Sequence, residues 1–176
     1  MSRQLRGEVV KIFSVDCETD GLYGDIWSVG AAVIDPETQT MQLWYGLIDT
    51  ACVQDQWVRE NIVSLVDFPP NFETREDMLN GFWAFWMQYR EDSICVADFG
   101  TPVEAGLFRA CVALDPDNRT WEGPYPMHEL GTALLLNAID VDVNRREMAG
   151  RDDLVQHHPV HDAIAAALCW LKIVKL

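Results

Sequence analysis

Three β-rich segments follow one another near the N-terminus, and their order restricts the fold more than any other feature of the sequence. The segments are residues 9–16 (VVKIFSVD), 26–35 (IWSVGAAVID) and 41–49 (MQLWYGLID). They are joined by DGLYGD and DPETQT, which carry the Gly, Asp and Pro residues typical of turns. Connections this short join antiparallel neighbours. The pattern therefore predicts a meander of three strands.

Beyond residue 74 the pattern changes to helices that alternate with shorter apolar runs. Phe82, Phe85, Trp86 and Tyr89 recur at helical spacing, and Thr74 is a plausible N-cap for that helix. We further expect a buried strand at residues 93–98 and a short apolar run at 127–130. Three more helical segments are expected at residues 102–114, 132–139 and 159–175. Antiparallel strands followed by alternating helices and strands predict an α/β fold with a mixed sheet flanked by helices.

Length and composition indicate one domain, residues 1–176, with no linker or low-complexity tract. The longest apolar run, residues 163–171, is far shorter than the ~20 residues of a membrane-spanning helix. The five cysteines form no CxxC pair and mostly lie in apolar runs, which favours reduced thiols. We therefore expect a soluble, unexported protein of the cytoplasm.

The formal net charge of −15 restricts the possible partners. Proteins that grip long duplexes usually present a basic surface, so this class is excluded. Two alternatives remain: the partner is not a nucleic acid, or the protein holds a short stretch of one strand and metal cations supply positive charge at the phosphate.

Asp16 and Glu18 end the first predicted strand, where residues two apart face the same side and can converge on one cation. The spacing alone carries little weight, because Asp35 and Glu37 repeat it in a turn. The first pair differs in following the apolar run IFSV. It is therefore expected at the edge of a buried sheet, where open α/β folds place their ligands.

A second group of polar residues, HHPVHDA, precedes the last predicted helix. Pro159 is suited to the first turn of that helix, which leaves His157 on the approaching loop and Asp162 in or near the first turn. A purely structural interpretation makes Asp162 an acid favoured by the helix dipole. A zinc site is disfavoured because the cysteines are scattered.

A third stretch, VADFGTPVEAGLF at residues 96–108, contains the acids Asp98 and Glu104. It has a complete structural interpretation as a helix start, with Thr101 as N-cap, Pro102 at N1 and Glu104 closing a capping box. The stretch by itself does not decide which acid, if either, is functional.

Together these stretches resemble the DEDDh 3'-to-5' exonucleases, the family of polymerase proofreading subunits and RNase T. Residues 16–22 (DCETDGL) resemble the family's D-x-E-T-x-G-L opening, and residues 28–31 (SVGA) resemble its second strand. His157 with Asp162 and Ala163 matches H-x(4)-D-A. The middle motif aligns without gaps, but Asp98-Phe99 replaces the usual His-Asn, and Glu104 replaces the metal-binding Asp.

The resemblance implies a ribonuclease H-like fold and two-metal-ion hydrolysis. Asp16, Glu18, Glu104 and Asp162 are then the ligands of two Mg²⁺ or Mn²⁺ ions, with Asp98 as the alternative third acid, and His157 is the general base. Thr19 and Leu22 are expected to contact the terminal nucleotide. The implied reaction releases nucleoside 5'-monophosphates from single-stranded 3' ends of DNA or RNA.

The sequence is compatible with two other functions. Because Glu replaces Asp at residue 104, the protein could be a catalytically weak or inactive module that binds nucleic acid or assists assembly. The second alternative is a ribonuclease H-like enzyme that cuts nucleic acid internally. A homodimer is also possible, since Trp83 extends the aromatic face of the helix at 74–90.

Overall fold

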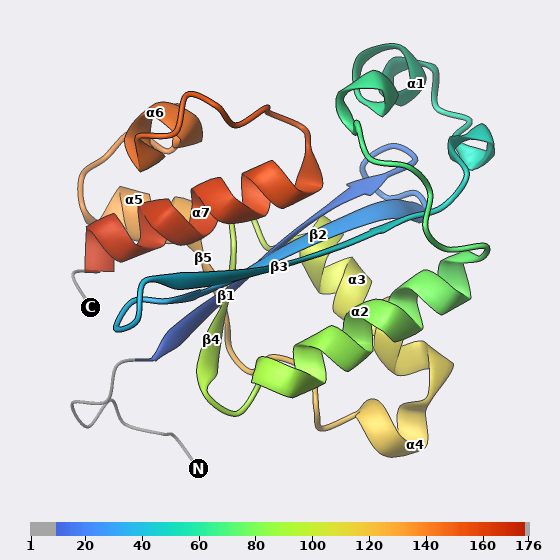
Figure 1. Ribbon diagram of the computed structural model, residues 1–176, viewed down its shortest axis with the longest axis horizontal. Helices are drawn as coiled ribbons and strands as arrows, with labels where there is room; N and C mark the ends of the chain where they lie inside the picture. Colours follow the sequence, from blue (N-terminus) through green and yellow to red (C-terminus); the bar gives the residue numbers. More distant parts are fainter. Residues whose placement is uncertain (1–9, 175–176) are drawn as a thin grey trace.

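The computed structural model describes residues 10–174, which form a mixed five-stranded sheet with helices on both faces (Figure 1). The order is β3-β2-β1-β4-β5, with β1 at the centre. The antiparallel strands are β1 (Lys11–Thr19), β2 (Ile26–Asp35) and β3 (Thr40–Leu47). Two parallel strands, β4 (Ser93–Ala97) and β5 (Met127–Glu129), continue beyond β1. This confirms the predicted α/β mixed sheet; Val9 and Lys175, at the ends of predicted elements, lie outside the described residues.

The helices form two groups on opposite sides of the sheet (Figure 1). One side carries α2 (Arg75–Tyr89), α3 (Val103–Leu114) and α4 (Pro116–Arg119). The other carries α5 (Leu130–Leu136), α6 (Arg145–Ala149) and α7 (Pro159–Val174). Between β3 and α2 the chain forms η1 (Thr50–Cys52), α1 (Gln56–Asn61) and η2 (Val63–Leu65). Across residues 10–174, no helix has the length and apolar character needed to cross a bilayer.

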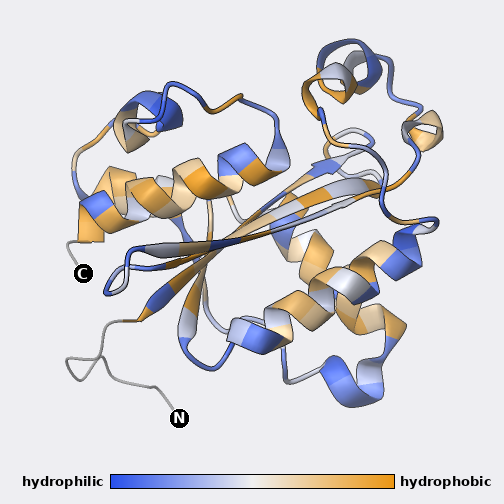
Figure 2. Cartoon of the chain, in the orientation of Figure 1, coloured by the Kyte–Doolittle hydropathy of each residue, from blue (hydrophilic) through white to orange (hydrophobic). Residues whose placement is uncertain are grey.

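Alternate residues of β1 supply the cores on the two faces of the sheet. Phe13 packs against Phe82, Phe85 and Trp86 of α2, with ring centroids 5.0 to 6.2 Å apart. Ile12, one residue earlier, belongs to the cluster that includes residues of α7 on the other face. Figure 2 shows hydrophobic residues gathered along the strands and on α3 and α7. The aromatic residues of α2 therefore build the core, as their helical spacing suggested.

The start of α2 is as predicted, because the Thr74 hydroxyl accepts a hydrogen bond from the Asp77 N–H at 3.1 Å. Trp83, which suggested a dimer surface, is instead buried within the chain. The Arg119 guanidinium lies 5.3 Å from its ring centroid. Trp83 is thus covered by this chain itself and offers no free face to a second copy.

The predicted capping box at the start of α3 is wrong. The N-cap is Pro102, with φ −91° and ψ −13°, and no side chain makes a capping hydrogen bond there. The helix begins at Val103, one residue later than predicted, and the Glu104 side chain is buried instead of returning to Thr101. A buried carboxylate in a first turn calls for an explanation other than capping.

Candidate active site

The end of β1 places two carboxylates on one face of the sheet. Asp16 and Glu18 share the face of Ile12, which packs with residues of α7, and pair with Gly30 and Ser28 of β2. The register shifts between Glu18 and Thr19, where the ladder becomes irregular. The acid pair therefore lies where regular pairing in β1 ends, beneath the start of α7.

Gly30 allows the N-terminus of α7 to approach the sheet closely. A Cβ atom at Gly30 would lie 2.2 Å from the carbonyl carbon of Pro159 and 2.3 Å from the nitrogen of Val160. Any other residue at this position would therefore push α7 away from β2. Gly30 pairs directly with Asp16 in the sheet. The packing of Pro159 and Val160 against Gly30 therefore fixes the distance between the start of α7 and the Asp16–Glu18 pair.

The start of α7 brings a histidine and a third acid to this edge. Glu18, His157 and Asp162 each offer a ligand atom, and these three atoms all lie within 4.8 Å of one another. The His157 backbone N–H donates to Asp162 Oδ2 at 2.7 Å. His157 has a φ of 61°, in a region that few residues other than glycine adopt, so this bond helps to hold an unusual loop conformation.

The other two histidines of the cluster serve different contacts. His158 is buried, and its Nε2 lies 3.2 Å from Asp67 Oδ1. His161 Nδ1 accepts a hydrogen bond from the Val155 N–H at 3.0 Å, and its ring stacks on that of His158. Their side chains position the loop before α7, whereas His157 faces the acids.

Asp16 and Glu104 are not in the three-residue cluster but line the same cavity, which has a volume of about 540 Å³. We call it the acidic cavity. Its walls come from the end of β1, the start of α3, the loop at 141–146 and the start of α7. Its acidic, arginine and histidine residues are Asp16, Glu18, Asp98, Glu104, Asp142, Arg145, Arg146, His157 and Asp162.

Four carboxylates of this cavity, those of Asp16, Glu18, Glu104 and Asp162, hold their protons unusually strongly, because their pKa values are raised. Burial, followed by repulsion from Asp162 and Glu104, raises the pKa of Glu18 to about 8. Burial raises the pKa of Glu104 and of Asp162 to about 7. The pKa of Asp16 is well above its ordinary range, through burial and then the charges of its acidic neighbours. Such a set of oxygen ligands suits divalent cations, whose charge offsets the repulsion.

Asp98 has a different partner from the other acids. Arg145 Nε donates to both oxygens of its carboxylate, at 2.9 and 3.1 Å, and the pair is largely shielded from solvent. The same guanidinium donates to the carbonyls of Val143 and Val141, at 2.6 and 2.7 Å. Asp98 therefore ties the end of β4 to the loop that walls the cavity.

Thr19 is the last residue of β1, and Leu22 lies on the loop that joins β1 to β2. Leu22 is 60% exposed and lines both the acidic cavity and a neighbouring cavity between this loop, α2 and α3, whereas Thr19 lines only the neighbouring one. The loop is fixed by Asp20, whose Oδ1 accepts hydrogen bonds from the Gln54 and Asp55 N–H groups at 2.9 and 2.6 Å. The two predicted nucleotide contacts thus share the neighbouring cavity, and only Leu22 also borders the acidic one.

Sequence reasoning missed Arg145 and Arg146, which line the acidic cavity. Both lie in α6, a helix of five residues that is too short for a periodic pattern to reveal. Nothing in the sequence near residue 145 points to a partner 47 positions away.

We predict that Gly30→Ala lowers the free energy of unfolding by about 3 kcal/mol, because the new methyl group overlaps the α7 backbone. Chemical denaturation measures this change. Gly106→Ala is the matched control: a Cβ there meets nothing within 4 Å and sits within α3, so we expect a gain of about 0.5 to 1 kcal/mol. A Gly30→Ala protein as stable as the wild type would contradict the inferred close packing.

A mixed α/β sheet with an acidic cavity at the end of its central strand defines the architecture of this protein. The nuclease domain of 3'hExo, described as a DEDDh family member bound to rAMP, has a similar structure. The TM-score is 0.53, with 11% sequence identity, over 95% of this chain and 92% of that one. At this identity the likeness shows a shared fold. No family model and no curated protein matches the sequence.

Proposed function

We propose that this protein is a metal-dependent 3'-to-5' exonuclease that releases nucleoside 5'-monophosphates from single-stranded 3' ends of DNA or RNA. The observation that carries the proposal is the convergence of Glu18, His157 and Asp162 within 4.8 Å, in one cavity with Asp16 and Glu104. The fold shared with a DEDDh nuclease domain supports it. We assign residues 1–176 to a single exonuclease domain of the cytoplasm.

The proposed ligands of two Mg²⁺ or Mn²⁺ ions are Asp16, Glu18, Glu104 and Asp162. When bound, these cations supply positive charge at the scissile phosphate and lower the pKa of water. We assign the third acid to Glu104 because the Asp98 carboxylate is bound by Arg145. Glu104 is buried in the first turn of α3 and lines the acidic cavity, where its carboxylate is proposed to bind metal.

His157 is proposed as the general base. Its backbone N–H is bound to Asp162, so the loop is anchored beside the acids while the imidazole remains able to accept a proton from water. Leu22, exposed at the rim of the same cavity, is proposed to pack against the terminal base. Thr19 is proposed to contact the same nucleotide from the neighbouring side.

The first test is digestion of a 5'-labelled single-stranded oligonucleotide, as DNA and as RNA, with Mg²⁺, with Mn²⁺ or with EDTA. We expect a ladder that shortens from the 3' end with either metal and is absent with EDTA. A circular single strand is the control, since an exonuclease leaves it intact. Cutting of the circle would indicate an internal nuclease, and binding without any cleavage would indicate a non-catalytic module.

A further inference from the structure

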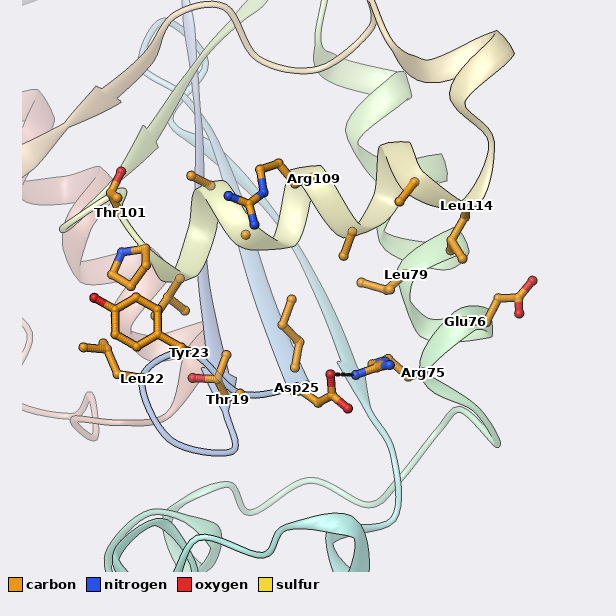
Figure 3. Close-up of a pocket in the computed structure, with 18 residues that line it drawn as sticks. Thr19, Leu22, Tyr23, Asp25, Arg75, Glu76, Leu79, Thr101, Arg109 and Leu114 are labelled. Atoms are coloured by element: carbon orange, nitrogen blue, oxygen red, sulfur yellow. Dashed lines mark ion pairs between the residues drawn. The ribbon is translucent and has the colours of Figure 1, made fainter.

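A second cavity, drawn in Figure 3, has a volume of about 650 Å³ and shares lining residues with the acidic one. It lies between the β1–β2 loop, α2 and α3, and we call it the α2–α3 cavity. Leu22, Thr101, Pro102 and Val103 line both cavities. A chain that passes Leu22 can therefore continue from one cavity into the other.

Arg109 of α3 lines the α2–α3 cavity and also a third cavity of about 610 Å³ on the other side of the helix. Figure 3 shows its guanidinium between Thr101 and Leu114. The side chain is exposed, and within residues 10–174 it makes no hydrogen bond or ion pair. The other arginines of the acidic and α2–α3 cavities contact protein oxygens: Arg75, Arg145 and Arg146.

An uncommitted guanidinium is notable in a chain with a formal net charge of −15. The α2–α3 cavity also contains Asp25, paired with Arg75, and Glu76 of α2. In Figure 3 Arg75 and Glu76 lie on α2 and Asp25 reaches Arg75 from the β1–β2 loop, while Arg109 lies on α3. An anion is therefore expected on the α3 side of the cavity.

Exposed apolar side chains accompany this charge. Tyr23 is 84% exposed and, like Leu22, borders the cavity at its junction with the acidic one. An aromatic ring and a cation that line one cavity, as Tyr23 and Arg109 do here, are the combination that proteins use to bind single-stranded nucleic acids, through base stacking and phosphate pairing. The α2–α3 cavity shares lining residues with the acidic cavity at one end and shares Arg109 with the third cavity. A strand of several nucleotides would use this continuity, whereas a small metabolite would not need it.

We propose that the α2–α3 cavity holds the nucleotides that precede the terminal one, and that Arg109 binds a phosphate of this upstream strand. The proposal rests on the exonuclease function proposed above. Leu22 then marks the boundary between the terminal nucleotide and its neighbour. Arg109 is a substrate-binding residue that sets the length of strand the protein grips.

The test compares kcat/KM for two substrates: a single-stranded hexanucleotide and the p-nitrophenyl ester of thymidine 5'-monophosphate. The ester presents a terminal nucleotide and a leaving group but no upstream phosphate. For Arg109→Ala we expect the ratio of hexanucleotide to ester kcat/KM to fall about tenfold. The slope of log kcat/KM against log salt for the hexanucleotide should fall in magnitude by about 0.7. Arg109→Lys, which keeps the charge, should restore most of the ratio.

Arg59→Ala is the matched control, because Arg59 is exposed on α1 and lines none of the three cavities. Its ratio should equal that of the wild type. A ratio unchanged in Arg109→Ala, or lowered equally in Arg59→Ala, overturns the Arg109 site while leaving the exonuclease intact. A wild-type protein that hydrolyses neither substrate overturns both proposals.

Discussion

Glu104→Gln is expected to lower the metal-dependent rate of single-strand digestion by about 10³-fold, since Glu104 is proposed to be a metal ligand and a charged ligand is worth several kcal/mol of transition-state stabilisation. The change nearly preserves the volume of a buried side chain but removes its negative charge and replaces one ligand oxygen by an amide nitrogen. The measurement is the single-turnover rate on a 5'-labelled oligonucleotide at saturating Mn²⁺. Saturation matters because a lost ligand also weakens metal affinity, and that loss must not be mistaken for a slower reaction.

Asp98→Asn is the matched variant for this experiment. It keeps an oxygen that can accept a hydrogen bond from Arg145, and its carboxylate is proposed to be structural, so we expect a fall of less than about tenfold. The reverse pattern, with Asp98→Asn inactive and Glu104→Gln active, would assign the third acid to Asp98. Two inactive variants would mean that the Asp98–Arg145 pair is needed to shape the cavity.

The second large effect is a loss of thermal stability of the metal-free protein as pH rises. Glu18 has a pKa of about 8, and Glu104 and Asp162 of about 7, against ordinary values of 4.5 for Glu and 3.8 for Asp. At a pH between the ordinary pKa of the unfolded chain and the raised pKa of the folded protein, the folded protein binds more protons than the unfolded chain. The free energy of unfolding therefore falls as pH rises through this range. We expect Tm to drop by about 10 °C between about pH 5 and pH 8.5.

Divalent cations should reverse this loss. Deprotonated carboxylates bind the cation, so millimolar Mg²⁺ or Mn²⁺ should raise Tm at high pH and have little effect near pH 5. Scanning calorimetry in EDTA and in Mn²⁺ gives both curves. Glu104→Gln should flatten the pH dependence in EDTA, while Glu37→Gln, in an exposed turn, should leave it unchanged. A Tm that is constant from pH 5 to 8.5 in EDTA would contradict the raised pKa values.

Local pattern was sufficient for most of the sheet and for the long helices. The meander of β1, β2 and β3 was predictable because β-branched runs were separated by turn sequences, and α2 because its aromatic spacing and Thr74 cap act within one helix. The short helices α1, α4 and α6 were missed. Each has six residues or fewer, too few for periodicity to register.

The start of α3 shows how tertiary contacts can override a local signal. Thr101, Pro102 and Glu104 fit a capping box by residue type, yet Glu104 is buried in the acidic cavity and the helix begins at Val103. The Glu104 carboxylate can either return to the backbone at the helix start or lie in the acidic cavity. The second position exists only because the end of β1, which is distant in sequence, forms one wall of that cavity.

The sequence by itself determined the mixed sheet and the chemical types of residue at the proposed site, because strand alternation and helix-start signals act over a few positions. Only the tertiary structure decided that Asp98 pairs with Arg145, that Trp83 is covered by Arg119, and that Arg109 lines two cavities without a partner among residues 10–174. Each of these outcomes depends on which side chains from distant segments come within a few ångströms. The spacing of residues along the sequence does not specify the distances between side chains of distant segments. Those distances are fixed by how the helices pack on the sheet.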